Sequence, residues 1–112
     1  MSNLAYQLDP EPVFFELFDE DGFILEPTHW NRELATHIAD FDGVGLLTDK
    51  HWQIIEHLRA HVLKFGGVPA MRRICRANGV SRDEMHDLFG GCRQIWRLAG
   101  LANPGEEAKA YF

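Results

Sequence analysis

The sequence predicts a mainly α-helical protein, an orthogonal helical bundle that contains a helix-turn-helix-like element and carries a small β-hairpin at its N-terminus. Apolar residues recur at helical spacing in several stretches between residues 30 and 98, and glycine-containing breaks separate these stretches. Before them lie two short β-favouring runs around an Asp-Gly turn. We expect one domain over residues 1–112, made of a β-hairpin region (1–26), a helical bundle (27–101) and a C-terminal tail (102–112).

The N-terminal region is expected to be β-structured. Residues 4–8 are expected to form a short strand, and the breaker cluster Asp9-Pro10-Glu11-Pro12 follows it. The runs 13–18 and 23–25 are rich in Phe, Ile, Leu and Val. Gly22, between these two runs, can adopt the positive φ that a tight turn needs. The pattern therefore predicts a hairpin over these two runs.

Two amphipathic helices are expected next. The first follows Thr28, a candidate N-cap, and ends at Gly43. The second follows Thr48, another candidate N-cap, and ends near Phe65. Their apolar faces comprise Trp30, Leu34, His37, Ile38 and Phe41 in the first helix, and Trp52, Ile54, Ile55, Leu58 and Val62 in the second.

A helix-turn-helix-like pattern occupies residues 69–89. Pro69 suits the first position of a helix. Asn78-Gly79 supplies the turn, and Ser81 is a candidate N-cap for the helix that follows. A last short helix is expected over residues 93–98. The inner faces of the two pattern helices are expected to be Met71, Ile74, Cys75, Met85, Leu88 and Phe89.

The composition excludes several classes of protein. Apolar residues at 46%, with eight Phe and three Trp, exclude a disordered chain. No apolar run approaches the roughly 20 residues of a membrane span, so no membrane association is expected. The first residues lack the pattern of a secretory signal. Two cysteines make a poor disulfide framework, and a reducing, cytoplasmic setting is expected.

The net charge of −6 is unevenly distributed along the chain. Residues 1–28 contain seven acids and no Lys or Arg, whereas residues 57–105 contain eight basic residues and three acids. We therefore expect a bipolar molecule with a basic C-terminal face. That face is either an ordinary solvated surface or a site for an anion or an acidic partner.

The helix-turn-helix-like element raises the question of DNA binding. Its second helix has a net charge of −2, which opposes contacts with phosphate groups. Three arginines on its first helix keep DNA binding as an alternative. The charged residues are Arg82, Asp83, Glu84 and Asp87 on the second helix and Arg72, Arg73 and Arg76 on the first.

Titratable residues offer one candidate for reactive chemistry. Cys92 opens the last short helix and precedes Arg93, and both a helix N-terminus and a neighbouring cation favour a thiolate. Cys75 falls on an apolar face and is expected to be an inert core residue. His57 and His61 share a helix face, but no third ligand accompanies them, so neither a metal site nor a cofactor is expected.

An ordered set of short motifs resembles the DsrC/TusE family. The matching residues are Asp21-Gly22-Phe23-Ile24-Leu25-Glu26-Pro27 with Trp30-Asn31, Leu47-Thr48-Asp49-Lys50-His51-Trp52 with Ile55, Pro69-Ala70-Met71-Arg72, Leu88-Phe89-Gly90-Gly91 and Ala99-Gly100-Leu101. They agree in order and spacing over roughly residues 21–104. The family includes the gamma subunit of dissimilatory sulfite reductase and carriers of the tRNA-thiolation sulfur relay. The resemblance implies a helical bundle with an N-terminal hairpin.

The resemblance also implies where the family's sulfur-carrying cysteines would stand. Family members carry sulfur on a penultimate cysteine of a flexible C-terminal arm, and some pair it with a cysteine about ten residues earlier. Counted from Ala99-Gly100-Leu101, the earlier position holds Trp96 and the arm position falls near Glu107. Neither thiol is present at these positions. Glu cannot replace the sulfur nucleophile of a persulfide, and Cys92 lies about one helical turn before Trp96.

Three functional hypotheses follow. The first is a DsrC/TusE-like protein of sulfur metabolism, an accessory or regulatory paralogue that binds protein partners and is not expected to be an enzyme. The second is a sulfur carrier or sulfurtransferase that uses Cys92. The third is a helix-turn-helix DNA-binding regulator. For the first hypothesis, the residues expected to contact an acidic or anionic partner are Arg72, Arg73, Arg93 and Arg97.

Overall fold

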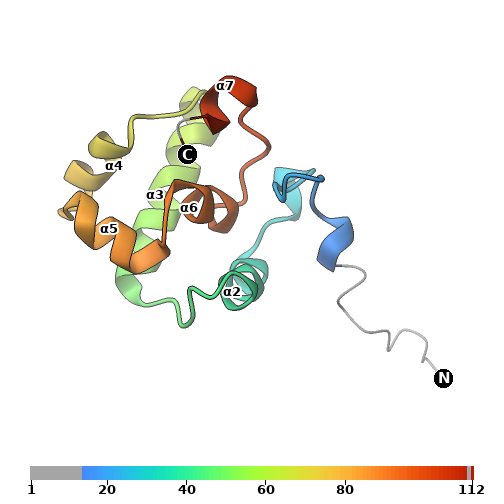
Figure 1. Cartoon of the computed structure of the whole chain (residues 1–112), viewed down its shortest axis with the longest axis horizontal. Coiled ribbons are helices and arrows are strands. Elements are labelled where there is room, and N and C mark those ends of the chain that lie inside the picture. Colours follow the sequence, from blue (N-terminus) through green and yellow to red (C-terminus); the bar gives the residue numbers. More distant parts are fainter. Residues whose placement is uncertain (1–13, 111) are drawn as a thin grey trace.

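A computed structural model describes residues 14–110 and 112, and it shows a bundle of helices (Figure 1). In chain order the elements are the 3₁₀ helix η2 (Pro27–His29), α2 (Arg32–Phe41), α3 (Asp49–Phe65), α4 (Met71–Ala77), α5 (Arg82–Phe89), α6 (Cys92–Leu98) and α7 (Glu106–Lys109). Helix α6 contacts α2, α3 and α5, and α4 contacts α3 and α5. The short helix α6 therefore occupies the centre of the bundle.

The core lies where α2, α3, α5 and α6 meet. Residues 95–101 are all buried, from Ile95 in α6 to Leu101 beyond it. The largest fully buried side chains are Phe23, Phe89, Ile38, Ile54, Ile55, Leu58, Ile74, Ile95, Leu98 and Leu101. Burial of such apolar surface is the main favourable contribution to folding. The expected helical bundle is therefore present. Most residues expected on its inner faces are buried or partly buried, but His37 and Phe41 are exposed.

The expected N-terminal β-hairpin is wrong for the described residues, which contain no strand. Only one isolated antiparallel bridge, between Phe18 and Ile24, joins the two runs. Residues 14–16 are instead helical, and the rings of Phe14 and Phe18, four residues apart, lie 5.0 Å from each other. The apolar pattern of this run fits a helical turn as well as a strand, and the helical turn forms. The expected strand over residues 4–8 lies outside the described residues.

Local capping chemistry explains where α2, α3 and α5 begin. The side chain of Thr48 accepts a hydrogen bond from the backbone N–H of His51, and Ser81 caps α5 through Glu84 in the same way. The predicted cap of α2 was wrong, because Asn31 caps that helix, whereas Thr28 lies within η2. Helix α4 begins at Met71, two residues after the predicted Pro69.

The helix-turn-helix-like element consists of α4, a turn and α5. Gly79 in the turn has φ of +67°, a conformation that glycine adopts without strain. The side chain of Asn78 is buried and donates a hydrogen bond to the carbonyl of Ile74, which closes the C-terminal end of α4. Over the part of the chain that the structure describes, no helix is long and apolar enough to span a membrane.

Candidate functional site

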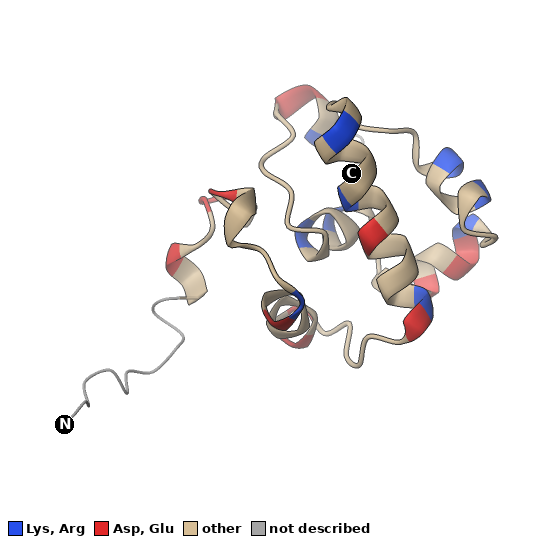
Figure 2. Cartoon of the chain, turned by 180° about the vertical axis from the view of Figure 1, so that it is seen from behind, with Lys and Arg blue, Asp and Glu red and all other residues tan. Residues whose placement is uncertain are grey.

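The predicted partner residues Arg72 and Arg73 lie on the exposed surface of α4, together with Arg76. Within residues 14–110 and 112, no ion pair or hydrogen bond to another side chain engages any of these three guanidinium groups. Figure 2 marks the basic positions of α4 in blue, far along the backbone cartoon from the acidic turn at residues 19–22. The three charges are therefore free to attract an anionic group from outside the chain.

The third predicted partner residue, Arg97, is buried inside the bundle instead. Its guanidinium forms a two-pronged ion pair with Asp42, with Nε to Oδ2 at 2.9 Å and Nη2 to Oδ1 at 3.1 Å. Nη1 donates to the carbonyl of Gly22, and the group lies over the ring of Phe18. Arg97 thus joins α6 to the end of α2 and to the acidic turn. These internal contacts occupy the guanidinium, and a partner contact by Arg97 stays a prediction.

The fourth predicted partner residue, Arg93, is exposed like Arg72 and Arg73 but makes internal contacts like Arg97. Its side chain is exposed, yet Nη2 donates a hydrogen bond to the carbonyl of Asp21 and the guanidinium lies over the ring of Phe23. The four predicted arginines therefore do not form one patch. Two of the arginines project from α4, and the other two extend from α6 and contact the acidic turn.

Cys92 lines a small pocket of about 110 Å³ between α4, α5 and α6. The residues Met71, Cys75, Arg82 and Met85 also line this pocket. Burial raises the pKa of the Cys92 thiol, although the charge of Arg82 opposes this rise. The expectation of a thiolate at Cys92 rested on the helix N-terminus and Arg93, whereas desolvation is the largest influence on this thiol.

Three side chains hold the backbone that leads from α6 into the tail. The indole Nε1 of Trp30 donates to the carbonyl of Leu98 at 2.8 Å, and that of Trp96 donates to the carbonyl of Ala102 at 2.8 Å. Arg59 lies over the indole of Trp30 and binds three carbonyl oxygens, at Pro27, Ala99 and Gly100. We call residues 98–102, fixed in this way, the clamped segment.

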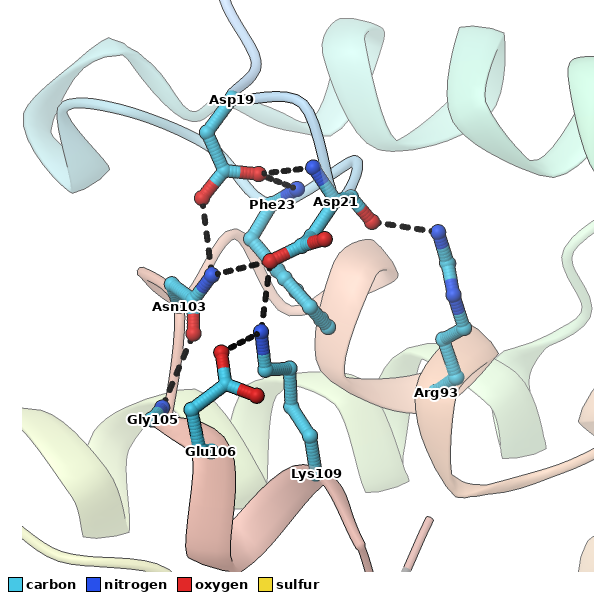
Figure 3. Close-up of polar contacts among 8 residues, drawn as sticks. All are labelled: Asp19, Asp21, Phe23, Arg93, Asn103, Gly105, Glu106 and Lys109. Carbon is cyan, nitrogen blue, oxygen red and sulfur yellow. Dashed lines mark hydrogen bonds and ion pairs between the residues drawn. The ribbon is translucent and has the colours of Figure 1, made fainter.

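Beyond the clamped segment, the tail folds back onto the acidic turn (Figure 3), which we define as residues 19–22. The amide of Asn103 donates to one carboxylate oxygen each of Asp19 and Asp21, both at 3.0 Å. Lys109 forms an ion pair of 2.6 Å with Asp21 and a second of 2.9 Å with Glu106. This cluster was not predicted from the sequence, where the uneven distribution of charge was its one signal.

The tail contacts shift the ionisation of the groups that make them. Hydrogen bonds from Lys109 and then from Asn103 lower the pKa of Asp21. The same contact with Asp21, aided by Glu106, raises the pKa of Lys109 to about 12. For Asp19, burial opposes ionisation, but hydrogen bonds from the Phe23 amide and Asn103 outweigh it and lower the pKa. All three groups are charged at neutral pH, so the ion pair is present there.

The histidine side chains at positions 51, 57 and 61 make contacts within the fold. His51 is buried, where Nδ1 completes the cap at Thr48 and Nε2 lies 2.7 Å from the carbonyl of Leu88. His57 contacts Asn78, and His61 packs on Phe65. In the described part of the chain, no group of three His, Cys, Asp or Glu residues could hold a metal ion. The exposed surface of α5 carries its acids, and DNA binding stays a prediction, which a gel-shift titration at low salt tests.

Comparison with known proteins gives concordant matches. A family model described as DsrC like protein matches residues 16–106. Sulfurtransferase TusE of Salmonella choleraesuis (strain SC-B67) is 33% identical over 96 residues, which cover 77% of this chain and 86% of the relative. The sulfurtransferase TusE homolog of Haemophilus influenzae is 34% identical over 98 residues, 79% of this chain and 88% of the relative.

Two solved structures share the fold. The crystal structure of dissimilatory sulfite reductase I (DsrI) superposes with a TM-score of 0.73 and 28% identity, over 79% of this chain and 86% of that one. The oxidized gamma subunit of the dissimilatory sulfite reductase (DsrC) from Archaeoglobus fulgidus gives a TM-score of 0.69 and 29% identity. That match covers 80% of this chain and 89% of the other.

Proposed function

The chain belongs to the DsrC-like family, and on this premise we propose that it acts in sulfur metabolism as an accessory or regulatory protein. It binds partner proteins of the sulfur-relay or sulfite-reductase kind and does not carry sulfur itself. The names of its relatives, sulfurtransferase TusE and the gamma subunit of dissimilatory sulfite reductase, support this class of partner. The cytoplasmic setting expected from the sequence remains part of the proposal.

One observation carries the proposal: residues 93–112 contain no cysteine. Sulfur transfer through a persulfide needs a thiolate that can be reached by a donor. In this chain the position matched to the family's earlier cysteine holds Trp96, whose buried indole holds the clamped segment. The thiol that precedes this position by four residues, Cys92, is half-buried, and burial raises its pKa. The scaffold is therefore retained without an accessible sulfur nucleophile in its tail.

The surface most suited to a partner is the basic cluster on α4. Arg72 and Arg73, with Arg76 beside them, present three exposed positive charges that no acid among residues 14–110 pairs with, on a protein whose net charge is −6. A local charge of opposite sign to the whole molecule selects for acidic surfaces and orients an approaching partner. Partner contacts by Arg93 and Arg97 also remain part of the proposal, although both guanidinium groups donate hydrogen bonds to backbone carbonyls of residues 21 and 22.

A binding experiment tests the proposal. Purified dissimilatory sulfite reductase is titrated with the wild-type chain and with a variant that carries Arg72→Ala and Arg73→Ala. We expect the double variant to bind about tenfold more weakly and with a shallower salt dependence. Arg32→Ala is the matched control, because Arg32 is also exposed but is paired with Glu56. Unchanged affinity in the double variant would count against the proposed surface.

The alternative function is sulfur transfer by Cys92, and the pocket around this thiol is the observation that favours it. In such a step the Cys92 thiolate would take the outer sulfur of a donor persulfide and release the donor as a thiolate. The chain is incubated with cysteine persulfide, and its intact mass is measured. We expect no gain of sulfur at Cys92. A gain that disappears in Cys92→Ser would establish the carrier function instead.

A further inference from the structure

The acidic turn is a built feature of the fold. One carboxylate oxygen of Asp19 accepts hydrogen bonds from the backbone N–H groups of Asp21 and Phe23, each at 2.9 Å. Gly22 has φ of +91°, and a Cβ atom there would lie 2.7 Å from the guanidinium groups of Arg93 and Arg97. The backbone of the turn is thus held by the side chain of Asp19 and by the guanidinium groups of Arg93 and Arg97. Its outward carboxylate oxygens are left for other donors.

Those donors come from the tail of the same chain. The tail offers the amide of Asn103 and the ammonium of Lys109 as donors, and Figure 3 shows their contacts with Asp19 and Asp21. It also brings the aromatic ring of Phe112 to the site. The ring of Phe112 lies 6.4 Å from that of Phe23 and 5.8 Å from that of Trp96, measured between centroids. The turn and these two rings together hold a lysine followed three residues later by a phenylalanine.

The tail is weakly fastened in this site. Helix α7 has four residues, none of them buried, and no side chain caps its N-terminus. The carboxylate of Asp21 is 44% exposed, and ion pairs at exposed carboxylates contribute little to stability. The site is also incompletely filled, because a pocket of about 410 Å³ remains among the turn, Phe23, Arg93 and the tail. Glu20, which lines this pocket, forms no ion pair in the described residues.

We propose that the acidic turn, with the rings of Phe23 and Trp96, is a docking site for a partner segment in which an aromatic residue follows a lysine or arginine. The chain's own tail occupies this site as an internal competitor. The charge of the site selects a basic segment, and the two rings select an aromatic one. This site lies far from the basic cluster on α4 (Figure 2), so it can fail or succeed independently of the proposed function.

Because the tail is tethered, it competes at a high effective concentration. Short flexible connections give effective concentrations in the millimolar range, so a free segment binds the wild-type chain poorly. Releasing the tail should therefore raise the affinity for a free segment. The double variant Lys109→Ala with Phe112→Ala removes both anchors of the tail from the full-length chain. Both residues are partly buried, and Phe112 packs against the edge of the core without belonging to its buried cluster.

The test uses a fluorescent peptide with the sequence of residues 102–112 as the probe. Fluorescence polarisation measures its affinity for the wild-type chain and for the tail-released double variant. We expect at least about tenfold tighter binding by the double variant. Adding Asp21→Asn to the double variant should abolish that gain. Glu107→Ala, at an exposed tail position, is the matched control and should behave as the wild type does.

Several outcomes would overturn the inference. Equal affinity of the wild type and the tail-released variant would show that the tail does not occupy the site. A gain that survives Asp21→Asn, or a peptide with Lys109→Glu that binds equally well, would show that the acidic turn is not the receptor. A wild-type dimer that Asp21→Asn dissociates would assign the site to a second copy of the chain instead.

Discussion

The indole ring of Trp30 lies against Gly100 so closely that a Cβ atom added at residue 100 would be 2.1 Å from Cδ1 of Trp30. The same indole donates to the carbonyl of Leu98 and lies under the guanidinium of Arg59. No side chain can be accommodated at residue 100 unless this arrangement moves. The contact between these two residues therefore fixes the start of the tail on the bundle.

Gly100→Ala should destabilise the protein by about 3 kcal/mol, because it combines a steric clash with a left-handed backbone. Gly45→Ala is the matched control. Gly45 also has a positive φ, of +86°, but nothing lies within 4 Å of its added Cβ, so a loss of about 1 kcal/mol is expected. Urea denaturation measures both free energies of unfolding. An equal decrease in the free energy of unfolding for the two variants would show that the side chain of Trp30 can move aside without destabilising the protein.

Arg97→Met should destabilise the protein by roughly 3 kcal/mol, because it leaves the largely buried carboxylate of Asp42 without its partner. Arg72→Met, the same change at an exposed arginine that forms no ion pair with any residue the structure describes, should change stability by less than about 0.5 kcal/mol. Thermal and urea unfolding compare the two variants. If Arg97→Met unfolds at the same urea concentration as Arg72→Met, the ion pair with Asp42 contributes nothing measurable.

Cys92 should react slowly with a disulfide reagent at neutral pH, because burial raises the pKa of its thiol above the usual 9.0. The rate should continue to increase with pH beyond 9. Arg82→Met should slow the reaction at a given pH further, because the charge of Arg82 favours the thiolate. The release of the coloured thiol of Ellman's reagent measures these rates, with Cys92→Ser as the blank. A rate plateau near pH 7 would contradict this assignment.

The contact of the tail with the acidic turn should be stable across neutral pH and should weaken in acid. Because the folded pKa of Asp21 is below 3.8, the stabilisation is complete above that value and is lost as the pH falls through the lowered pKa. Because the pKa of Lys109 is raised to about 12, its stabilisation is complete below 10.5 and is lost as the pH rises through about 12.

The groups that face Asp21 are Lys109, Asn103, Arg93, Asp19 and, through Lys109, Glu106. No histidine is among them. The side-chain amide signal of Asn103 in NMR spectra reports the contact over the whole pH range. A transition between pH 6 and 7 would contradict the assignment, since no histidine side chain faces Asp21. Lys109→Met should remove the alkaline transition while it leaves the acidic one.

The parts of the fold that local chemistry determines could be predicted from the sequence. Thr48 and Ser81 were identified as caps because a cap depends only on the residues of the first turn. The choice of Thr28 over Asn31 was wrong, because both residues are good caps and Pro27 starts a short 3₁₀ helix before α2. The hairpin was wrong because Phe14 and Phe18 fit the period of a helix as well as that of a strand.

The parts that distant contacts determine could not be predicted. Arg97 was expected on the surface with the other arginines, since nothing near it in the sequence indicates that Asp42, 55 residues away, pairs with it. Helix α7 is only four residues long, and its contact with Asp21 spans 88 residues. For Cys92 the local rule pointed to a thiolate, whereas the surrounding helices α4 and α5 supply the burial that opposes it.

The clamped segment has a practical consequence for experiments on this protein. Since Trp30, Arg59 and Trp96 fasten the backbone up to Ala102, any swing of the tail must pivot at Asn103. A spin label or dye placed at Glu107, which is exposed, would report that swing while the bundle serves as a stationary reference. The same probe placed within residues 98–102 would break the hydrogen bonds of the Trp30 and Trp96 indoles to the backbone. Its signal would then report a disrupted structure and not the motion of the tail.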